Sequence, residues 1–251
     1  MSATIGILFD LPMWLWLLYH IIIGILIVID LWIRRTKEMD FKESVIWSVI
    51  WISVGLAFGV MILILGGLEA AGLYYTAFVI EKMLSMDNLF VFAVIFSYFK
   101  VPFIAQPFVL YVGIVTAAIM RGAFIYGGIW LIERFYWSVF IFGAVLFVSG
   151  IRLLKGPHDR VNPERNPVVR LAKRFLPLAD YYDGYKFIIR PQDRGTVLFT
   201  PLIICLIAIE MTDIIFAFDS VPVAIAITLN FAIAYTSNIS AVLGLRSLYF
   251  L

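Results

Sequence analysis

Long apolar runs recur along the whole chain, separated by short polar connections. Each run approaches or exceeds the roughly 20 apolar residues that a helix needs to cross the hydrocarbon core of a bilayer. The runs predict membrane-crossing helices over residues 12–33, 44–65, 70–98, 104–130, 136–154, 197–228 and 235–251. We therefore expect an all-α polytopic membrane protein of about seven transmembrane helices, with residues 1–251 forming a single transmembrane domain.

Composition excludes a soluble domain of this size. Hydrophobic residues make up 63% of the chain and charged residues 14%, whereas about a quarter of the residues in an average soluble protein are charged. The single cysteine, Cys205, lies inside an apolar run, which excludes a disulfide framework and a thiolate metal cluster. The first apolar run lacks the basic start and small-residue cleavage site of a signal peptide, so we expect a retained span.

Basic residues collect on one side of the predicted spans. Arg34, Arg35, Lys37 and Lys42 lie between the first two spans, and ten more lie between Arg152 and Arg194. Connections on the opposite side contain only Arg134. Because positive charge stays on the cytoplasmic side, we expect a plasma-membrane protein whose N-terminus is extracytoplasmic and whose 155–196 loop is cytoplasmic.

The 155–196 loop is the only extended polar segment. Five prolines interrupt it, and between them Val168 to Leu176 predicts one short basic amphipathic helix. Such a helix is typical of a segment lying on anionic lipid. A docking site for a partner membrane protein is the alternative.

Five carboxylates lie within predicted spans and carry the candidate chemistry: Glu81, Asp87, Glu210, Asp213 and Asp219. A charged side chain at the centre of an isolated membrane helix costs about 2.5–3.5 kcal/mol or more, and intramembrane ionisable groups usually mark ion or proton pathways. A purely structural role, in which paired or protonated carboxylates set the helix register, is the alternative. The clustering of five on two spans favours a cation pathway.

The acids form two matched pairs. Glu81 and Asp87 are six residues apart, and so are Asp213 and Asp219. An amide or hydroxyl side chain follows the second acid of each pair: Asn88 and Ser220. Six residues advance a continuous helix by about 600°, which places the two acids of a pair on different faces. They converge on one site more easily where the helix is interrupted.

Pro222 is the predicted interruption. It has no N–H, and its ring clashes with the carbonyl of Phe218, four residues earlier. The freed carbonyl lies beside Asp219, where it is a candidate cation ligand. A break near Asp87 is expected only by analogy.

A second match follows each acid pair. Residues 113–122 and 238–247 both place an arginine after a stretch of small residues, at Arg121 and Arg246. The copies are three spans apart and would run through the bilayer in opposite directions. The pattern predicts inverted repeats, helices three to five and six onward, with the site at their interface.

A count of charges constrains the cargo. Lys82, Arg121 and Arg246 accompany the five acids and are candidates for charge balance and coupling. If all eight groups are ionised, the formal sum of −2 suits one divalent cation, which protons could replace. Carboxylate, amide, hydroxyl and carbonyl oxygens suit Mg²⁺, Ca²⁺ and Mn²⁺. We expect a transported metal rather than a resident cofactor, and no nucleic acid.

Two further features guide the interpretation. Asp30 ends the first span beside Arg34 and Arg35, so an interfacial ion pair is expected, with a gate as the alternative. Gly55 and Gly59 form a small-xxx-small pair that is typical of helix packing.

Intramembrane aspartates are also found in membrane proteases, so an enzyme function is an alternative to transport. However, no Gly-x-Gly-Asp, HExxH, Gly-x-Ser-x-Gly or P-loop pattern is present, and we expect no enzyme.

Several segments resemble the TerC/Alx family of membrane proteins. They are residues 81–92 (EKMLSMDNLFVF), 166–170 (NPVVR), 216–222 (FAFDSVP), 236–238 (TSN) and 243–251 (LGLRSLYFL). The resemblance implies a Mn²⁺ exporter with inverted three-helix repeats, whose important acidic positions match the five carboxylates above. Similar proteins usually continue past residue 251 with one or two spans, so the second repeat is expected to lack its third helix here.

Two other functions stay open. One is a membrane scaffold or insertion factor linked to tellurite resistance or protein secretion, in which buried charges bind partner helices. The other is a Ca²⁺ or Mg²⁺ transporter.

Overall fold

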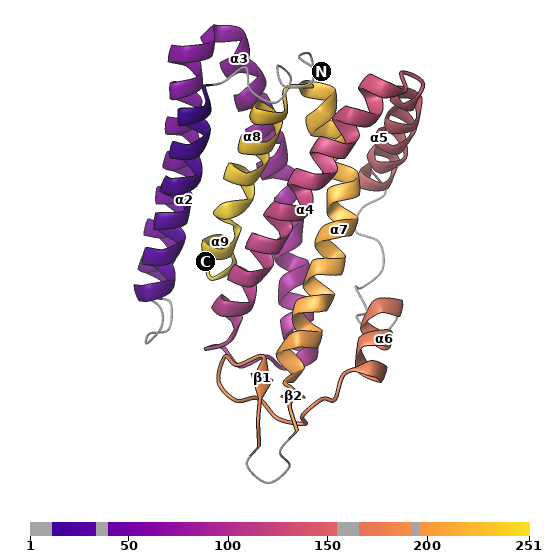
Figure 1. Cartoon of the computed structure of the whole chain (residues 1–251). Coiled ribbons are helices and arrows are strands. Elements are labelled where there is room, and N and C mark those ends of the chain that lie inside the picture. The colour runs from indigo at the N-terminus through magenta and orange to yellow at the C-terminus, as the bar shows by residue number, and fades with distance from the viewer. Residues whose placement is uncertain (1–11, 34–39, 155–165, 192–195) are drawn as a thin grey trace.

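The computed structural model describes residues 12–33, 40–154, 166–191 and 196–251 (Figure 1). Helices dominate this part of the chain, and four of them are long and apolar enough to cross a membrane by length and composition. The helices are α2 (Met13–Ile33), α3 (Phe41–Phe99), α4 (Gln106–Arg134), α5 (Ser138–Leu154), α6 (Pro167–Phe175), α7 (Pro201–Ile227), α8 (Phe231–Leu243) and α9 (Leu245–Tyr249). The predicted all-α polytopic membrane fold is confirmed.

Helix α3 contains two of the predicted spans, joined at a bend. Gly67 has φ 80° and ψ −177°, a backbone conformation that only glycine adopts readily, and it separates the two halves. The halves fold back on each other, since the hydroxyls of Tyr74 and Tyr75 each donate to a backbone carbonyl 19 residues earlier, at Gly55 and Leu56, over 2.9 Å. The two halves of α3, on either side of Gly67, therefore correspond to the predicted spans 44–65 and 70–98.

The predicted small-residue pair lies in this contact. A Cβ atom at Gly55 would be 2.7 Å from the ring of Phe78, and one at Gly59 would overlap the ring of Tyr75. The two glycines therefore let the aromatic side chains of the second half of α3 approach the first half closely, as the spacing predicted.

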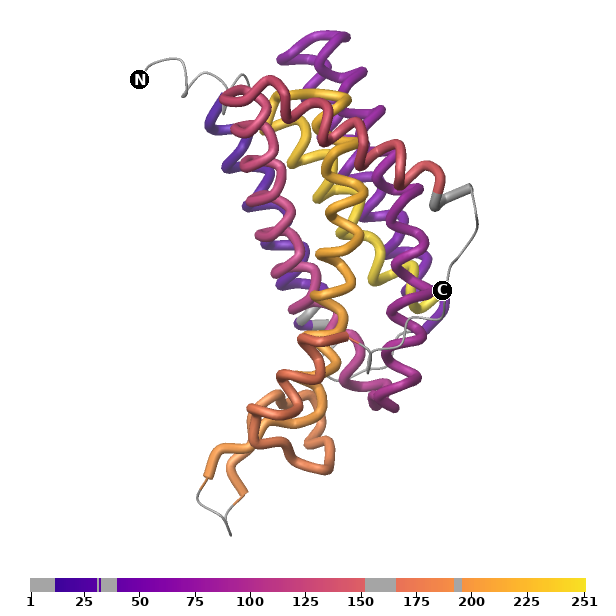
Figure 2. Tube along the Cα trace, turned by 90° about the vertical axis from the view of Figure 1, so that its right-hand side faces the viewer, coloured from indigo at the N-terminus to yellow at the C-terminus, as the bar shows by residue number. Residues whose placement is uncertain are grey.

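The directions of the helices agree with inverted repeats. The second half of α3 runs away from the Gly67 bend, α4 and α7 run the opposite way, and α8 runs with α3 (Figures 1 and 2). Packing shows that α4 and α7 run in the same direction. Val109 and Leu202, near the starts of the two helices, share one apolar cluster. Ile129 and Ile225, near their ends, share another. The second half of α3 is therefore antiparallel to α7, as α4 is to α8.

The expected helix break at Pro222 is wrong. Helix α7 continues from Pro201 to Ile227 with the buried Pro222 inside it. A proline is tolerated in a membrane helix where neighbouring helices and local adjustments compensate for the missing hydrogen bond. The ring still removes the donor that the carbonyl of Phe218 would otherwise use, but the helix is not interrupted.

The last predicted span, 235–251, is divided instead. Helix α8 ends at Leu243 and the short α9 begins at Leu245, with Gly244 between them. Lys82 on α3 donates through Nζ to the carbonyl of Ala241 over 2.9 Å. A cation at a helix C-terminus satisfies a carbonyl that has no helical partner and offsets the helix dipole. Lys82 therefore caps α8, and its role in charge balance or coupling stays a prediction.

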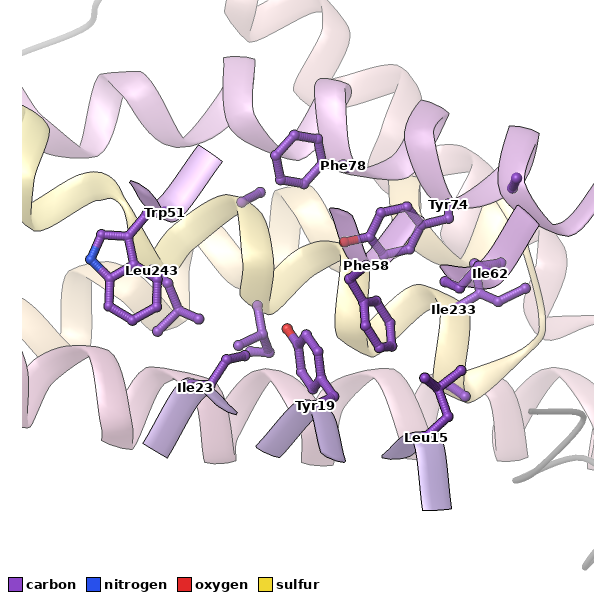
Figure 3. Packing of buried hydrophobic residues seen from close by; sticks show 14 of the residues in the cluster. Leu15, Tyr19, Ile23, Trp51, Phe58, Ile62, Tyr74, Phe78, Ile233 and Leu243 are labelled. Atoms are coloured by element: carbon purple, nitrogen blue, oxygen red, sulfur yellow. The ribbon is translucent and has the colours of Figure 1, made fainter. Parts of the chain in front are cut away.

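Buried aromatic side chains join α2, α3 and α8 into one apolar cluster. Leu15 and Tyr19 of α2 face Phe58 and Tyr74 of α3 in Figure 3. Inside the cluster, Ser240 of α8 is 2.8 Å from the hydroxyl of Tyr19 and 3.2 Å from that of Tyr74. The hydroxyls satisfy one another in an apolar setting, which fixes the packing of the three helices.

The described part of the 155–196 loop folds against one end of the bundle (Figures 1 and 2). The amphipathic helix predicted over Val168–Leu176 is confirmed as α6. The prediction missed a short antiparallel pair, β1 (Ile188–Ile189) and β2 (Leu198–Phe199). Tyr182 donates to the carbonyl of Phe99, and its partial burial raises its pKa to about 12, so the phenol stays a donor at neutral pH.

Candidate cation site

Arg121 of α4 is the centre of a buried charged cluster. Its side chain is 1% exposed. Its Nη1 donates to Glu81 of α3 and, over 2.9 Å, to Oδ1 of Asn238 of α8. Its Nε and Nη2 donate to the two carboxylate oxygens of Asp213 of α7, over 3.4 and 3.3 Å. Four helices thus meet at one guanidinium, whose planar donors suit paired carboxylates.

The inverted arrangement explains why these side chains meet. Glu81 and Asp213 are the first acids of the two matched pairs, and they project from antiparallel helices onto the same arginine. Two polar groups support them. Ser85, one turn after Glu81, donates to its carboxylate over 3.1 Å, and Ser220 accepts from Arg121 over 3.4 Å.

Glu210 extends the cluster along α7. It lies about one turn before Asp213, and Thr116 of α4 donates to its Oε1. A Cβ atom at Gly113 would be 3.5 Å from the same oxygen, so the small residue leaves room for the carboxylate. The other oxygen, Oε2, is buried without a hydrogen-bond partner among the described residues.

Two buried amide side chains, Asn88 and Asn238, have unused hydrogen-bonding capacity. Asn88 is 1% exposed, yet neither its Oδ1 nor its Nδ2 has a partner in the described part of the chain. The Nδ2 of Asn238 is also buried without a hydrogen-bond partner among the described residues. A buried polar group left unpaired costs about 1–3 kcal/mol, and such groups call for an explanation. One explanation is that these groups bind a polar ligand or a water molecule from outside the chain.

The second acids of the pairs, Asp87 and Asp219, do not join the cluster around Arg121, and their place on a cation pathway stays a prediction. Asp219 is half-buried and accepts a hydrogen bond from Ser149 of α5. Asp87 is exposed on the outer face of α3, next to the exposed Met83 and Met86. The physical reason is the continuous helix, which turns the two acids of each pair to different faces.

Arg246, matched in sequence to Arg121, also lies outside the cluster. It is 1% exposed and pairs with Asp30 of α2. Its described ion pair is thus with Asp30 and not with the central carboxylates, and its predicted coupling role stays a prediction. The Asp30 side chain is 0% exposed, and its expected partners Arg34 and Arg35 lie outside the described residues, so the predicted ion pair with them stays a prediction.

The charges in the cluster remain suited to a divalent cation. Three carboxylates, Glu81, Glu210 and Asp213, oppose one guanidinium, which leaves a formal charge of −2 when all are ionised. Within the described ranges, no three acidic, histidine or cysteine side chains lie together as a ready-made metal site. Arg121 bridges two of the three carboxylates, Glu81 and Asp213.

Sequence reasoning overlooked several polar side chains that the structure places beside the acids: Thr116, Ser149 and Asn238. Thr116 and Asn238 lie in the two matched arginine segments, where a polar residue in an apolar run was a usable signal. Ser149 is a single hydroxyl in an apolar helix, and nothing in the sequence singles it out.

Comparison with known proteins identifies the family. The sequence pattern described as "Integral membrane protein TerC family" matches residues 66–251. Alx of Escherichia coli K12, whose printed name is "Putative membrane-bound redox modulator Alx", is 36% identical over 248 residues, covering 94% of this chain and 77% of that protein. A Myxococcus xanthus membrane protein is 39% identical over 218 residues, covering 87% of this chain and 68% of the relative.

A Rickettsia felis membrane protein is 39% identical over 237 residues, covering 94% of this chain and 78% of the relative. No solved structure matches. The extent of these matches leaves no ambiguity about ancestry, and the chain belongs to the TerC family of integral membrane proteins.

Proposed function

We propose that this member of the TerC family exports a divalent metal cation, Mn²⁺ before others, through the cluster around Arg121. The observation that carries the proposal is the buried surplus of negative charge around Arg121, and buried unpaired amides on α3 and α8 support it. Glu81, Asp213 and Glu210 outnumber the single guanidinium, and Asn88 offers hydrogen-bonding atoms that nothing in the described chain uses. Membrane proteins rarely tolerate such groups except on an ion or proton pathway.

Arg121 gives the cluster a stable state without metal. The guanidinium neutralises Glu81 and Asp213 in the low-dielectric interior, where two unpaired carboxylates would be costly. An entering divalent cation competes for the same oxygens, and the guanidinium retains Ser220 and Asn238 as neutral acceptors. Arginine and metal thus alternate as counter-charges, and protons on the carboxylates are a third way to neutralise the empty site.

The ligand chemistry supports a hard cation. Carboxylate and amide oxygens suit Mn²⁺, Mg²⁺ and Ca²⁺, and the preference for Mn²⁺ comes from the family resemblance. The orientation follows from the basic connections, which place the N-terminus outside the plasma membrane and the 155–196 loop in the cytoplasm. Cytoplasmic metal would therefore enter from the end of the bundle that carries α6 and the β1–β2 pair.

The printed redox name of the Alx relatives has little support in this chain. A dithiol reaction needs two thiols, whereas the chain has one cysteine, Cys205, and it is buried. Redox chemistry based on a cysteine pair within one chain is therefore not favoured over cation transport.

The test compares wild type with Glu81→Gln and Asp213→Asn in manganese-stressed cells and in proteoliposomes that report Mn²⁺ flux. We expect each variant to lose most of the tolerance and flux, while Asp180→Asn, which changes an exposed loop carboxylate, behaves as wild type. Mn²⁺ flux at the wild-type level in both cluster variants would contradict the proposal. If α6 deletion gave a phenotype while the cluster variants gave none, a scaffold role would replace it, and competition by Ca²⁺ or Mg²⁺ would reassign the ion.

A further inference from the structure

Helix α6 presents three different faces, and the cation site around Arg121 uses none of them. Its residues fall into three stripes, because positions three or four apart share one side of a helix. One stripe is apolar and packed, one is apolar and exposed, and one is basic and exposed. In that order, the stripes are Val169, Ala172 and Leu176; Val168, Leu171 and Phe175; and Arg170, Lys173 and Arg174.

The packed stripe holds α6 against the ends of two membrane helices. Val169 is fully buried and shares an apolar cluster with Leu202, in the first turn of α7. Lys173 lies over the ring of Phe99, the last residue of α3, with its Nζ 5.7 Å from the ring centroid. Because α3 and α7 are long enough to cross a membrane, α6 lies where these spans end, at the bilayer surface (Figure 1).

The second stripe is apolar and is left uncovered by the described part of the chain. Leu171 is 57% exposed and Phe175 is 72% exposed. A helix at a membrane surface buries such a stripe in the boundary between the lipid headgroups and the acyl chains. Since α6 packs beside the spans, the bilayer around the bundle is the apolar phase nearest to this stripe.

The third stripe gives the contact its charge preference. Arg170 and Arg174 are one turn apart and exposed, and α6 contains no acidic residue. The planar donors of arginine suit phosphate oxygens. In the topology proposed above, this loop faces the cytoplasmic leaflet, whose anionic lipids attract basic segments close to the membrane. Charge and apolar surface on α6 therefore match one ligand, an anionic phospholipid.

We propose that α6 binds anionic phospholipid at the cytoplasmic surface of the bilayer, with Leu171 and Phe175 in the acyl-chain boundary and Arg170 and Arg174 on headgroup phosphates. The inference does not depend on which cation is transported. Helix α6 follows α5, the third helix of the first predicted repeat, and precedes α7, the first helix of the second. The segment that joins the two repeats is thus attached to the membrane surface through lipid.

The experiment places a fluorophore on α6 and measures its quenching by nitroxide-labelled lipids. The full chain carries Leu171→Cys for labelling and Cys205→Ala, which removes the single native thiol. It is reconstituted into phosphatidylcholine vesicles that contain about a quarter phosphatidylglycerol as the anionic lipid. The nitroxide, placed on the acyl chain close to the headgroup, is carried by one lipid or the other at the same low fraction.

The matched control label is Ile188→Cys, on β1. Its side chain is 53% exposed, close to the value for Leu171, but β1 lies beyond the end of the bundle (Figure 1). We expect neither lipid to quench this label.

At Leu171 we expect quenching by both lipids, and at least about fivefold more by labelled phosphatidylglycerol, because basic side chains concentrate anionic lipid around them. Arg170→Gln/Arg174→Gln should lower this preference to less than about twofold, because only Lys173 remains on the stripe. Lys186→Gln/Arg190→Gln removes the same charge from exposed positions of the same loop outside α6 and should leave the preference unchanged.

Each other result overturns the proposal. Absence of quenching at Leu171 places the apolar stripe away from the bilayer, as a docking site for a partner protein requires. Equal quenching by the two lipids, or a preference that survives Arg170→Gln/Arg174→Gln, removes the role of the arginines.

If the arginine variant does not fold, ionic strength decides on the chain with both arginines present. Raising it from about 0.1 M to about 1 M shortens the Debye length from about 10 Å to about 3 Å. The preference for phosphatidylglycerol must then fall, and an unchanged preference overturns the proposal. None of these measurements uses Mn²⁺, so this proposal and the proposed function can fail separately.

Discussion

The two copies of the acid and arginine pattern share a sequence spacing but have different surroundings. In both copies the first acid, Glu81 or Asp213, reaches Arg121. The second acids differ: Asp219 is half-buried and accepts a hydrogen bond from α5, whereas Asp87 is exposed on the outer face of α3. Equal spacing thus sets which face each acid occupies, and the helix that packs on that face decides its environment.

The two arginines show the same principle. Both are buried and both end a matched segment, yet one joins two repeats through two acids and the other binds one acid of α2. A repeat therefore predicts where a charge lies along the helix. It does not predict its partner when the partner comes from a helix outside the repeat.

Removal of the arginines should give the largest contrast. Breaking a buried pair by deleting one partner costs about 3–5 kcal/mol. We expect Arg121→Gln, which removes the ion-pair partner of Glu81 and Asp213, at the upper end of this range and Arg246→Gln, which removes one ion pair of Asp30, at the lower end. Chemical unfolding in mixed micelles measures both, and Arg134→Gln at an exposed position is the control. An equal loss for the two arginines would contradict the difference between the sites.

Neutralising the second acids should give a smaller and unequal effect. Asp219→Asn replaces a charge-assisted hydrogen bond with a neutral one, which we expect to cost about 1–2 kcal/mol of unfolding free energy. Asp87→Asn should change it by less than about 0.5 kcal/mol, since the surroundings of an exposed side chain change little on unfolding. The same unfolding assay applies. A larger loss for Asp87→Asn would show that another helix covers it in the membrane.

Ser149→Ala should give the smallest effect, because it removes only the hydroxyl that donates to Asp219. Side-chain hydrogen bonds between membrane helices average about 0.6 kcal/mol, and we expect about 1 kcal/mol here because the acceptor is a carboxylate. A double-mutant cycle with Asp219→Asn should show non-additive losses. Ser97→Ala, at an exposed position on α3, is the control. Additive losses would place the serine outside the Asp219 interaction.

Much of the fold could be predicted because the lengths of the apolar runs, and the polar connections between them, determine where helices cross a membrane. The predicted spans correspond to the described helices, and α6 appears between the expected prolines. What the sequence did not show were contacts between distant residues: Lys82 caps α8 and Arg246 binds Asp30. The predicted break at Pro222 was a separate error, since α7 continues through it.

The sequence by itself determined the membrane class, the family and the register of the acids, because each depends on the order of residues along a helix. Only the tertiary structure decided which of the five carboxylates share a site. Glu81 and Asp213 meet because antiparallel helices turn both toward Arg121, and Glu210 follows one turn away. Asp87 and Asp219 lie elsewhere because a continuous helix rotates them to other faces, and the packing of α2 and α5 supplies the partners of Arg246 and Asp219.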